Sequence, residues 1–429
     1  YSWFTSMDVD KGGNAWVGTV IDGFYVIDMH NFSVTRTLDI PLLSGNTVRN
    51  GIQSIYCDRE NNSVWIGLYN QGMCYYHPSM NKIVLYNKKM INGDWKGEEI
   101  RCMLETSRGE ILMGTTQGVY RYEPETKSMN RFYHEFSQKN CRVLYEDSKK
   151  RVWVGTYHDG LYCIDHGKVQ SYDYPDTDYQ NELDFSNIRV MVEDSSGRLW
   201  VSIYGGVGLF NPENGQINLL SEQFPELKKY KVANALAIDN QSRLVVGSDN
   251  GLYIYDPATN KIWIPEQDGQ ANSIFNQGSI KYNQILKDHE GTLWFATQYG
   301  LSVLTYNGQS YTLGKEEGLS KAILNVVEDK NHDIWISTVT SIYKIKVDRR
   351  ADKYSFHVIS CLSEDEIRQD DLYSFPSLMT RDNQLFLGLM NGFIAFSPEN
   401  MIDNQCLNRP LFTSFRLFNV PVVSGETYN

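Results

Sequence analysis

The chain repeats one alternation of apolar and polar positions nine times. Each copy has a short apolar run, an acidic or polar turn, and a second apolar run that usually contains Trp and ends on Gly-Thr or a close substitute. Taking the Trp position as the register, the copies fall at Trp16, Trp65, Leu112, Trp153, Trp200, Val245, Trp294, Trp335 and Phe386. The eight intervals average about 46 residues, which is typical of one blade of a propeller.

Each repeat predicts four short strands. After the Trp run, a loop closes on Gly and leads into an aromatic strand, as in 118–122, 160–165 and 251–257, and a fourth run follows, as in 129–132. A single four-stranded sheet cannot bury both of its faces, whereas a radial stack of such sheets buries each against its neighbours. We therefore predict an all-β fold, a β-propeller, in which the recurring Trp fills the gap between blades and the following Gly permits close backbone packing.

Nine copies exceed the four to eight blades of a single ring. Counting seven blades back from Phe386 reaches Leu112, which leaves the copies at Trp16 and Trp65 for another unit. We predict that residues 1–88 are the last two blades of a truncated first propeller and that residues 89–400 form a second, seven-bladed one. The two N-terminal blades are expected to expose apolar blade faces, because they lack partners.

Composition narrows the class of protein. The formal net charge of −12 argues against general binding to nucleic acid or to an anionic membrane. No apolar run approaches the roughly 18 residues that a membrane span needs. The seven cysteines form no C-x-x-C pair, and we interpret them as small buried hydrophobes.

The repeat phrase, an acidic turn followed by Leu/Ile-Trp-Val/Ile-Gly-Thr, Gly-Leu-Tyr and Asp-Pro, resembles the regulator-propeller repeat of the periplasmic sensor regions of Bacteroidetes-type hybrid two-component systems. The tail Arg409-Pro410-Leu411-Phe412 and its continuation to Asn419 resembles the entrance to the three-tyrosine β-sandwich that follows the last blade in that family, which assigns residues 401–429 to the start of that domain. The resemblance implies a periplasmic ectodomain, tethered to the inner membrane, that dimerises, binds a glycan-derived oligosaccharide and signals to a histidine kinase. It implies no cofactor, no nucleic-acid contact and no catalysis by this segment.

A candidate ligand site follows from the repeat register. The residue eleven before the register position lies near the start of the innermost strand, and three consecutive blades place arginine there: Arg101, Arg142 and Arg189. Loops expected on the same rim carry Tyr157, His158 and Tyr204. Arginine suits carboxylate or sulfate groups and aromatic rings suit sugar faces, so we predict that this rim binds an anionic ligand, such as an acidic or sulfated oligosaccharide.

Three alternatives stay open. Each arginine could pair permanently with a nearby acid such as Glu98, Glu99 or Asp184. The chain could be a propeller lyase acting on uronate-containing substrates, with His158 as the base, or a protein-binding platform. No metal site is predicted: His289 and His332 fall in turns on the opposite rim, and the recurring acidic pairs are interpreted as turn residues.

Overall fold

The computed structural model describes residues 3–21, 23–36, 51–60, 62–69, 72–76, 84–174, 183–265, 280–319, 322–350, 353–362, 376–401, 416–417 and 420–421. Strands dominate this part of the chain. Its α-helix, α1 (Leu220–Gln223), has a single turn, and four short 3₁₀ helices accompany it: η1 (His134–Phe136), η2 (Pro225–Lys229), η3 (Lys315–Glu317) and η4 (Pro398–Asn400). In these described ranges, no helix has the length and apolar character that crossing a membrane requires.

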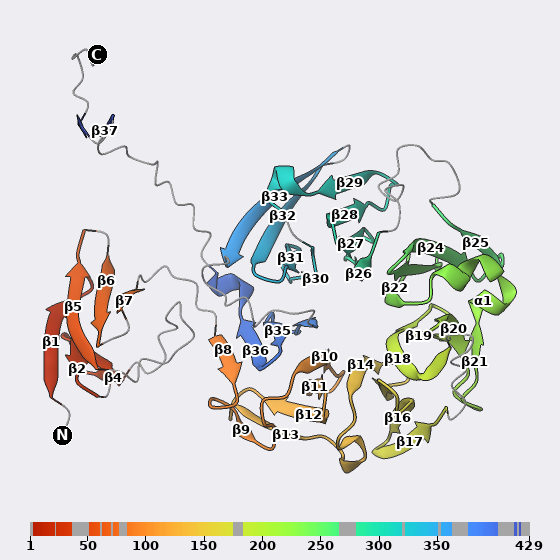
Figure 1. Ribbon diagram of the computed structural model, residues 1–429, viewed down its shortest axis with the longest axis horizontal. Helices are drawn as coiled ribbons and strands as arrows, with labels where there is room; N and C mark the ends of the chain where they lie inside the picture. The colour runs from red at the N-terminus through yellow and green to blue at the C-terminus, as the bar shows by residue number, and fades with distance from the viewer. Residues whose placement is uncertain are drawn as a thin grey trace.

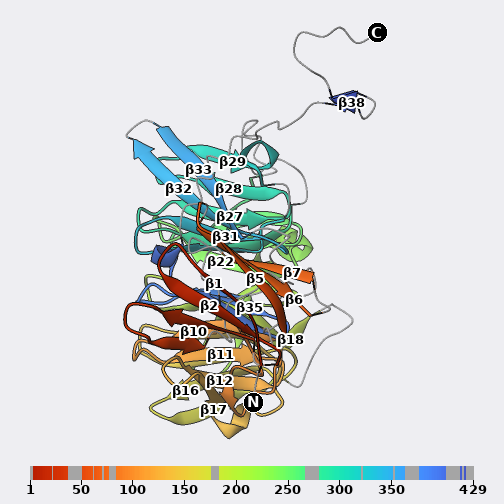
Figure 2. The same ribbon diagram turned by 90° about the vertical axis from the view of Figure 1, so that its left-hand side faces the viewer.

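The described strands between residues 84 and 396 form seven sheets that follow one another around an axis (Figure 1). The first three are β10 (Ile100–Glu105), β11 (Ile111–Thr115), β12 (Gly118–Glu123) and β13 (Ser128–Arg131), with β9 (Asn92–Gly93) at their edge; β14 (Cys141–Glu146), β15 (Val152–Thr156), β16 (Leu161–Asp165) and β17 (Lys168–Tyr172); and β18 (Asp184–Glu193), β19 (Leu199–Tyr204), β20 (Gly206–Phe210) and β21 (Ile217–Leu219). The next three are β22 (Ala233–Ile238), β23 (Leu244–Ser248), β24 (Gly251–Asp256) and β25 (Lys261–Trp263); β26 (Tyr282–Lys287), β27 (Leu293–Thr297), β28 (Gly300–Leu304) and β29 (Ser310–Leu313); and β30 (Asn325–Glu328), β31 (Ile334–Ser337), β32 (Ile342–Arg350) and β33 (Lys353–Leu362). The long hairpin of β32 and β33 projects beyond its neighbours (Figure 2). This architecture confirms the prediction of an all-β propeller.

The seventh sheet combines the last three strands of the ring with β8 (Val84–Asn87), a strand that precedes the first ring sheet in the sequence. It contains β34 (Ser377–Met379), β35 (Leu385–Leu389), β36 (Gly392–Phe396) and, as its outer strand, β8. The predicted boundary at residue 88 assigned β8 to the N-terminal unit, but β8 pairs antiparallel with β36. Tyr86 stacks on Phe393 with ring centroids 4.9 Å apart. Pairing the start of the ring with its end covers a sheet edge that would otherwise be exposed, so β8 closes the ring.

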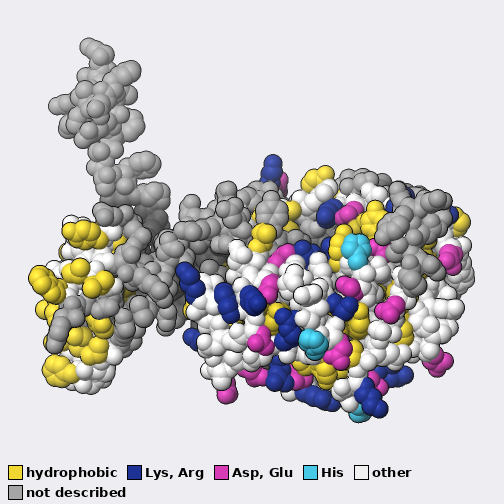
Figure 3. All heavy atoms as spheres, turned by 60° about the horizontal axis from the view of Figure 1, so that its bottom comes forward, with side chains coloured by type: hydrophobic (Ala, Val, Ile, Leu, Met, Phe, Trp, Pro, Cys, Tyr) yellow, Lys and Arg dark blue, Asp and Glu magenta, His cyan; other side chains and the backbone are white. Residues whose placement is uncertain are grey.

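The segment before β8 forms two further sheets, which lie to one side of the ring in Figure 1. One contains β1 (Phe4–Val9), β2 (Asn14–Thr19), β3 (Phe24–Asp28) and β4 (Val34–Arg36), and the other contains β5 (Ile52–Asp58), β6 (Ser63–Leu68) and β7 (Gly72–Tyr76). They pack on one another through Trp16, Phe24 and Ile52. Their outer faces expose Phe4, which is 76% accessible, and Met73, which is 66% accessible, and hydrophobic side chains gather on this unit in Figure 3.

The register tryptophans fill the spaces between sheets, as predicted. Trp16, Trp153, Trp200, Trp294 and Trp335 are all buried, and each indole Nε1 donates a hydrogen bond to the aspartate six residues earlier. That aspartate also accepts bonds from the backbone of its own turn, so the acidic turn and the Trp form one unit. Trp65 is the exception: it is 38% exposed, because no described sheet covers its face.

Two smaller predictions also hold. A Cβ placed on Gly155 would lie 2.5 Å from Val143 Cγ1 and 2.7 Å from Ile188 Cγ2, so the glycine after the Trp run permits close contact between neighbouring sheets. Five cysteines, Cys57, Cys102, Cys141, Cys163 and Cys361, are buried free thiols. The side chains of Cys74 and Cys406 lie outside the described residues.

The C-terminal assignment is largely outside the described part of the chain. Within 401–429 the structure describes β37 (Arg416–Leu417) and β38 (Val420–Pro421), which pair antiparallel. The β-sandwich and the boundary at residue 400 therefore remain predictions. The division of the chain into two propellers also remains a prediction, although β8 pairs with the ring and not with the N-terminal sheets.

Candidate functional site

A β-bulge in the innermost strand positions each candidate arginine. The pairing register of β10 with β11 shifts between Ile100 and Cys102, which makes Arg101 the extra residue. The same shift occurs at Arg142 in β14 and at Arg189 in β18. A bulged residue leaves the alternation of the strand and its side chain is re-aimed. The sequence register located these positions, but only the pairing shows that a bulge presents them.

Among the three arginines, Arg142 is the one whose positive charge has no acidic or hydrogen-bonding partner in the described structure. Within the described structure its guanidinium has no hydrogen-bond or ion-pair partner; it lies over the Tyr157 ring, 4.5 Å from the centroid. Burial, followed by the charges of Arg189 and Arg101, lowers the pKa of Arg142 to about 10. The same charges show that the three guanidinium groups influence one another. A bound anion would offset this unfavourable environment.

Arg189 takes part in a polar network along the rim. Its Nη2 donates to Asn234 Oδ1 at 3.0 Å, and Asn234 Nδ2 donates to Asp249 Oδ1 at 2.7 Å. Lys281 Nζ lies 3.4 Å from the same Asp249 oxygen. Burial lowers the pKa of Arg189, and the charge of Asp249 opposes that effect. The carboxylate reaches Arg189 only through an amide, so its neutralisation is indirect.

Arg101 is paired with a nearby acid, which is the alternative to ligand binding stated above. Its Nη2 lies 2.8 Å from Glu99 Oε2, in a half-buried ion pair. The Nε atoms of Arg101, Arg142 and Arg189 are nevertheless all buried without a partner among the described residues. Buried donors without an acceptor are uncommon in folded proteins, which sets these three arginines apart from an ordinary surface group.

Tyr157 and His158 lie next to Arg142, in the loop between β15 and β16. Their ring centroids are 3.9 Å apart, and His158 Nδ1 lies 3.2 Å from Asp184 Oδ2. His158 has a φ of 115°, whereas the other non-glycine residues with positive φ in the described ranges lie between 48° and 66°. Such a conformation is strained for a residue with a Cβ, and strain of this kind collects at functional sites.

Tyr204, at the end of β19, completes the set. The residue is 37% exposed and, like Tyr157, it acts to raise the pKa of Arg189. The six residues selected from the sequence therefore lie on one rim, in three adjacent sheets. The sequence reasoning missed the bonds that Asn234 and Asp249 make here, because their pairing with Arg189 crosses between sheets.

Two hollows of the ring surface lie away from this rim. One of about 330 Å³ is bounded by residues of β12, β13, β15 and β16, including Arg121, Phe132 and Val152. Arg121 there pairs with both Glu110 and Glu123. Because this arginine is already neutralised, we regard the rim of Arg142 as the better candidate for an anion site.

The likeness to known proteins is one of structure. No protein-family profile matches the chain, and no curated protein matches it in sequence. The extracellular domain of a protein assigned as the hybrid two-component system BT3049 of B. thetaiotaomicron superposes with a TM-score of 0.68 at 20% identity, over 94% of this chain and 52% of that one. The extracellular domain of BT4673 of the same organism gives a TM-score of 0.58 at 20% identity, over 98% of this chain and 56% of that one.

A streptogramin B lyase gives a TM-score of 0.52 at 12% identity, over 75% of this chain and 99% of that one. These likenesses establish the fold, and at such low identity they establish the fold alone. The chain spans about half the length of the two sensor domains. The function of the whole protein is therefore a matter of proposal.

Proposed function

We propose that this chain is the ligand-sensing part of a periplasmic sensor region, which binds an anionic oligosaccharide and signals to a histidine kinase. The observation that carries the proposal is Arg142, a half-buried guanidinium beside two others, stacked on Tyr157 and without an acidic partner in the described structure. The structural likeness to extracellular domains of two-component systems supports the sensor role. Homodimerisation and a tether to the inner membrane are part of the proposal.

The arrangement suits an acidic or sulfated sugar. Arginine presents a planar fork to a carboxylate or sulfate, and the exposed ring of Tyr204 suits the apolar face of a sugar ring. Tyr157 contributes by holding the Arg142 guanidinium over its own ring. Arg189 and His158 add donors beside Arg142. Arg101, already paired with Glu99, is expected to contribute less.

Calorimetric titration with uronate-containing, sulfated and neutral oligosaccharides tests the proposal. Arg142→Ala should weaken binding of the anionic ligand by about 1.5–3 kcal/mol, the range for hydrogen bonds to charged groups. Arg142→Lys should restore little, because an ammonium lacks the fork. Arg121→Ala, remote and paired with two glutamates, is the matched control. Unchanged affinity with a large fall in melting temperature for Arg142→Ala would make this arginine structural.

A lyase is the second candidate. The pairing of His158 with Asp184, beside Tyr157 and Arg142, is the arrangement that favours it, because a carboxylate-oriented histidine can act as a base. Incubation with uronate-containing oligosaccharides, with and without divalent metal, measures this directly. We expect no unsaturated product absorbing in the ultraviolet. Sustained turnover that His158→Ala abolishes would replace the sensor proposal with the enzymatic one.

A further inference from the structure

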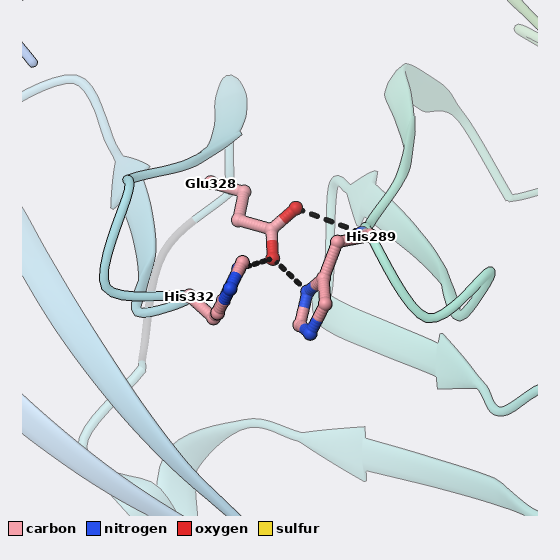
Figure 4. A group of neighbouring side chains, drawn as sticks. All are labelled: His289, Glu328 and His332. Carbon is pink, nitrogen blue, oxygen red and sulfur yellow. Dashed lines mark hydrogen bonds and ion pairs between the residues drawn. The ribbon is translucent and has the colours of Figure 1, made fainter.

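A cluster of two imidazoles and a carboxylate lies on the rim opposite the arginines. His289 is in the turn between β26 and β27, Glu328 ends β30, and His332 is in the turn between β30 and β31. One ligand atom from each lies within 4.8 Å of the other two. Figure 4 shows both Nδ1 atoms near the same carboxylate oxygen, Glu328 Oε1, and His332 Nδ1 is 3.0 Å from it. The two rings stack with centroids 3.5 Å apart.

Part of this cluster is a contact common to the repeats. Glu146 and Glu193 each accept bonds from the backbone N and the Oγ of a serine in the preceding turn, Ser107 and Ser148 respectively. Glu328 makes the same backbone bond, at 2.9 Å, to His289. The presence of Glu328 is therefore explained by this contact between neighbouring sheets. In other repeats a serine makes the contact, so the contact does not require a histidine.

The two histidines are not needed for that contact between sheets. His289 occupies the place of Ser107 and Ser148. His332 occupies a turn position with φ of 64°, where the equivalent residue of an earlier repeat is Gly197, with φ of 76°. The left-handed region favours glycine over histidine. Two adjacent turns thus each carry a histidine where these earlier repeats carry serine or glycine, which have no metal-binding nitrogen in their side chains.

Two imidazole nitrogens and one carboxylate oxygen form a ligand set found in zinc sites with an open coordination position. We propose that His289, Glu328 and His332 bind a divalent transition-metal ion of the zinc type, with water as the remaining ligand. Tetrahedral ligands about 2.0–2.1 Å from zinc lie about 3.3 Å from one another. The 3.0 Å between His332 Nδ1 and Glu328 Oε1 is close to this spacing. His289 Nδ1 lies nearer to Glu328 Oε1 than two zinc ligands can, so the His289 ring has to move away from the carboxylate to admit the ion.

The surroundings contain a group that can orient one ligand. Glu290 Oε1 is 3.9 Å from His289 Nε2, the nitrogen that faces away from Glu328. Glu290 Oε2 accepts a bond from the Tyr354 hydroxyl at 3.0 Å and pairs with Arg349 Nε at 3.2 Å. A distance of 3.9 Å is longer than a hydrogen bond, but a small rotation of either side chain would let Glu290 accept the Nε2 proton and fix the orientation of His289 as a metal ligand. The Arg349 charge, which would oppose a cation, is offset by Glu290 and by Asp288, 3.2 Å away.

Titration of the tag-free 429-residue chain with Zn²⁺ tests the site, with Co²⁺ absorption as a probe of coordination. We expect one Zn²⁺ per chain. His289→Ser and His332→Gly install residues found at the equivalent positions of earlier repeats (Ser107, Ser148 and Gly197), so the fold and the contact between sheets should be retained while the affinity falls. Since loss of an orienting partner weakens a metal site about 10–100-fold, Glu290→Gln should weaken it about tenfold and each histidine variant at least about 100-fold.

His166→Ala is the control, because His166 is an exposed histidine 2.6 Å from a carboxylate oxygen of Asp165, outside the cluster. It should leave Zn²⁺ affinity unchanged. The proposal is overturned if the wild type shows no saturable Zn²⁺ binding up to about 1 mM, the limit of weak specific affinity. It is equally overturned if the chain with both His289→Ser and His332→Gly binds Zn²⁺ as tightly as the wild type.

Discussion

The hydrogen bond between the repeat aspartate and its Trp allows a stability prediction with an internal control, because one repeat has the aspartate but lacks the Trp. Asp194 Oδ2 accepts bonds from Trp200 Nε1 at 2.9 Å and from Arg198 Nε at 2.7 Å. Its Oδ1 accepts the backbone N–H groups of Ser196 and Arg198. Asp194→Asn keeps the shape and the backbone bonds, but its amide NH₂ then faces two donors.

The expected loss follows from those two bonds. Trp200 is 2% exposed, so its indole N–H is left buried without an acceptor, which costs about 1–3 kcal/mol. The Arg198 side chain is 40% exposed, and loss of its ion pair adds about 0–1 kcal/mol. Asp194→Asn should therefore lower the free energy of unfolding by about 1–4 kcal/mol, a large share of the roughly 5–15 kcal/mol typical of a folded protein.

Lowering the pH should reduce the difference in free energy of unfolding between the wild type and Asp194→Asn. Burial acts to raise the pKa of Asp194, but the hydrogen bonds from Trp200, Arg198 and Ser196 together bring the pKa below its usual range. A carboxyl whose pKa is lowered in the folded state contributes stability above its unfolded pKa of about 3.9, and that contribution is lost as pH falls through the folded value. The effect of Asp194→Asn should therefore be full at neutral pH and shrink below about pH 4.

Asp239 provides the control. It has the same bonds to its turn and to Arg243 Nε, at 2.7 Å, but the residue six positions later is Val245, which has no donor. Urea unfolding followed by circular dichroism should show Asp239→Asn to be milder than Asp194→Asn by about 1–3 kcal/mol, with equal slopes against urea. Equal losses for the two variants would refute the reasoning that the indole bond carries the difference.

Three further predictions concern strain, closure and exposure. His158→Gly should keep or raise the free energy of unfolding by up to about 1–3 kcal/mol, because glycine relieves the strained φ, yet it should weaken anionic ligand binding; lower stability would contradict this. Tyr86→Ala should destabilise the ring by about 2–4 kcal/mol in urea unfolding, since it removes the stack on Phe393 that holds the closing strand; a change below 0.5 kcal/mol, within the usual range for surface substitutions, would show that β8 contributes little. Hydrogen exchange should be faster in β1 and β6 than in β14–β16, because Phe4 and Trp65 are exposed on an uncovered face; equal protection would rule out a weaker N-terminal unit.

Much of the fold could be predicted from the sequence because the interactions that define each repeat are between residues close together in the chain. The aspartate, the turn and the Trp of one copy lie within about ten residues of one another, and each copy encodes the same four strands. The register alone placed the buried tryptophans, with Trp65 the failure, since its burial depends on a neighbouring sheet rather than on its own repeat. It also located Arg101, Arg142 and Arg189, whereas Tyr157, His158 and Tyr204 were chosen from loops expected on the same rim; a binding role for these six residues stays a prediction.

Contacts that cross between repeats were decided only by the tertiary structure. The pairing of β8 with β36 joins segments about 300 residues apart, and nothing in either segment identifies its partner. The arginines look alike in sequence, but Glu99 neutralises Arg101 and no described acid pairs with Arg142. His289 and His332 belong to no sequence motif, because they meet only where the turns of two sheets are packed side by side. Local repetition specifies the blade, whereas the chemistry of the rims depends on which residues the closed ring brings together.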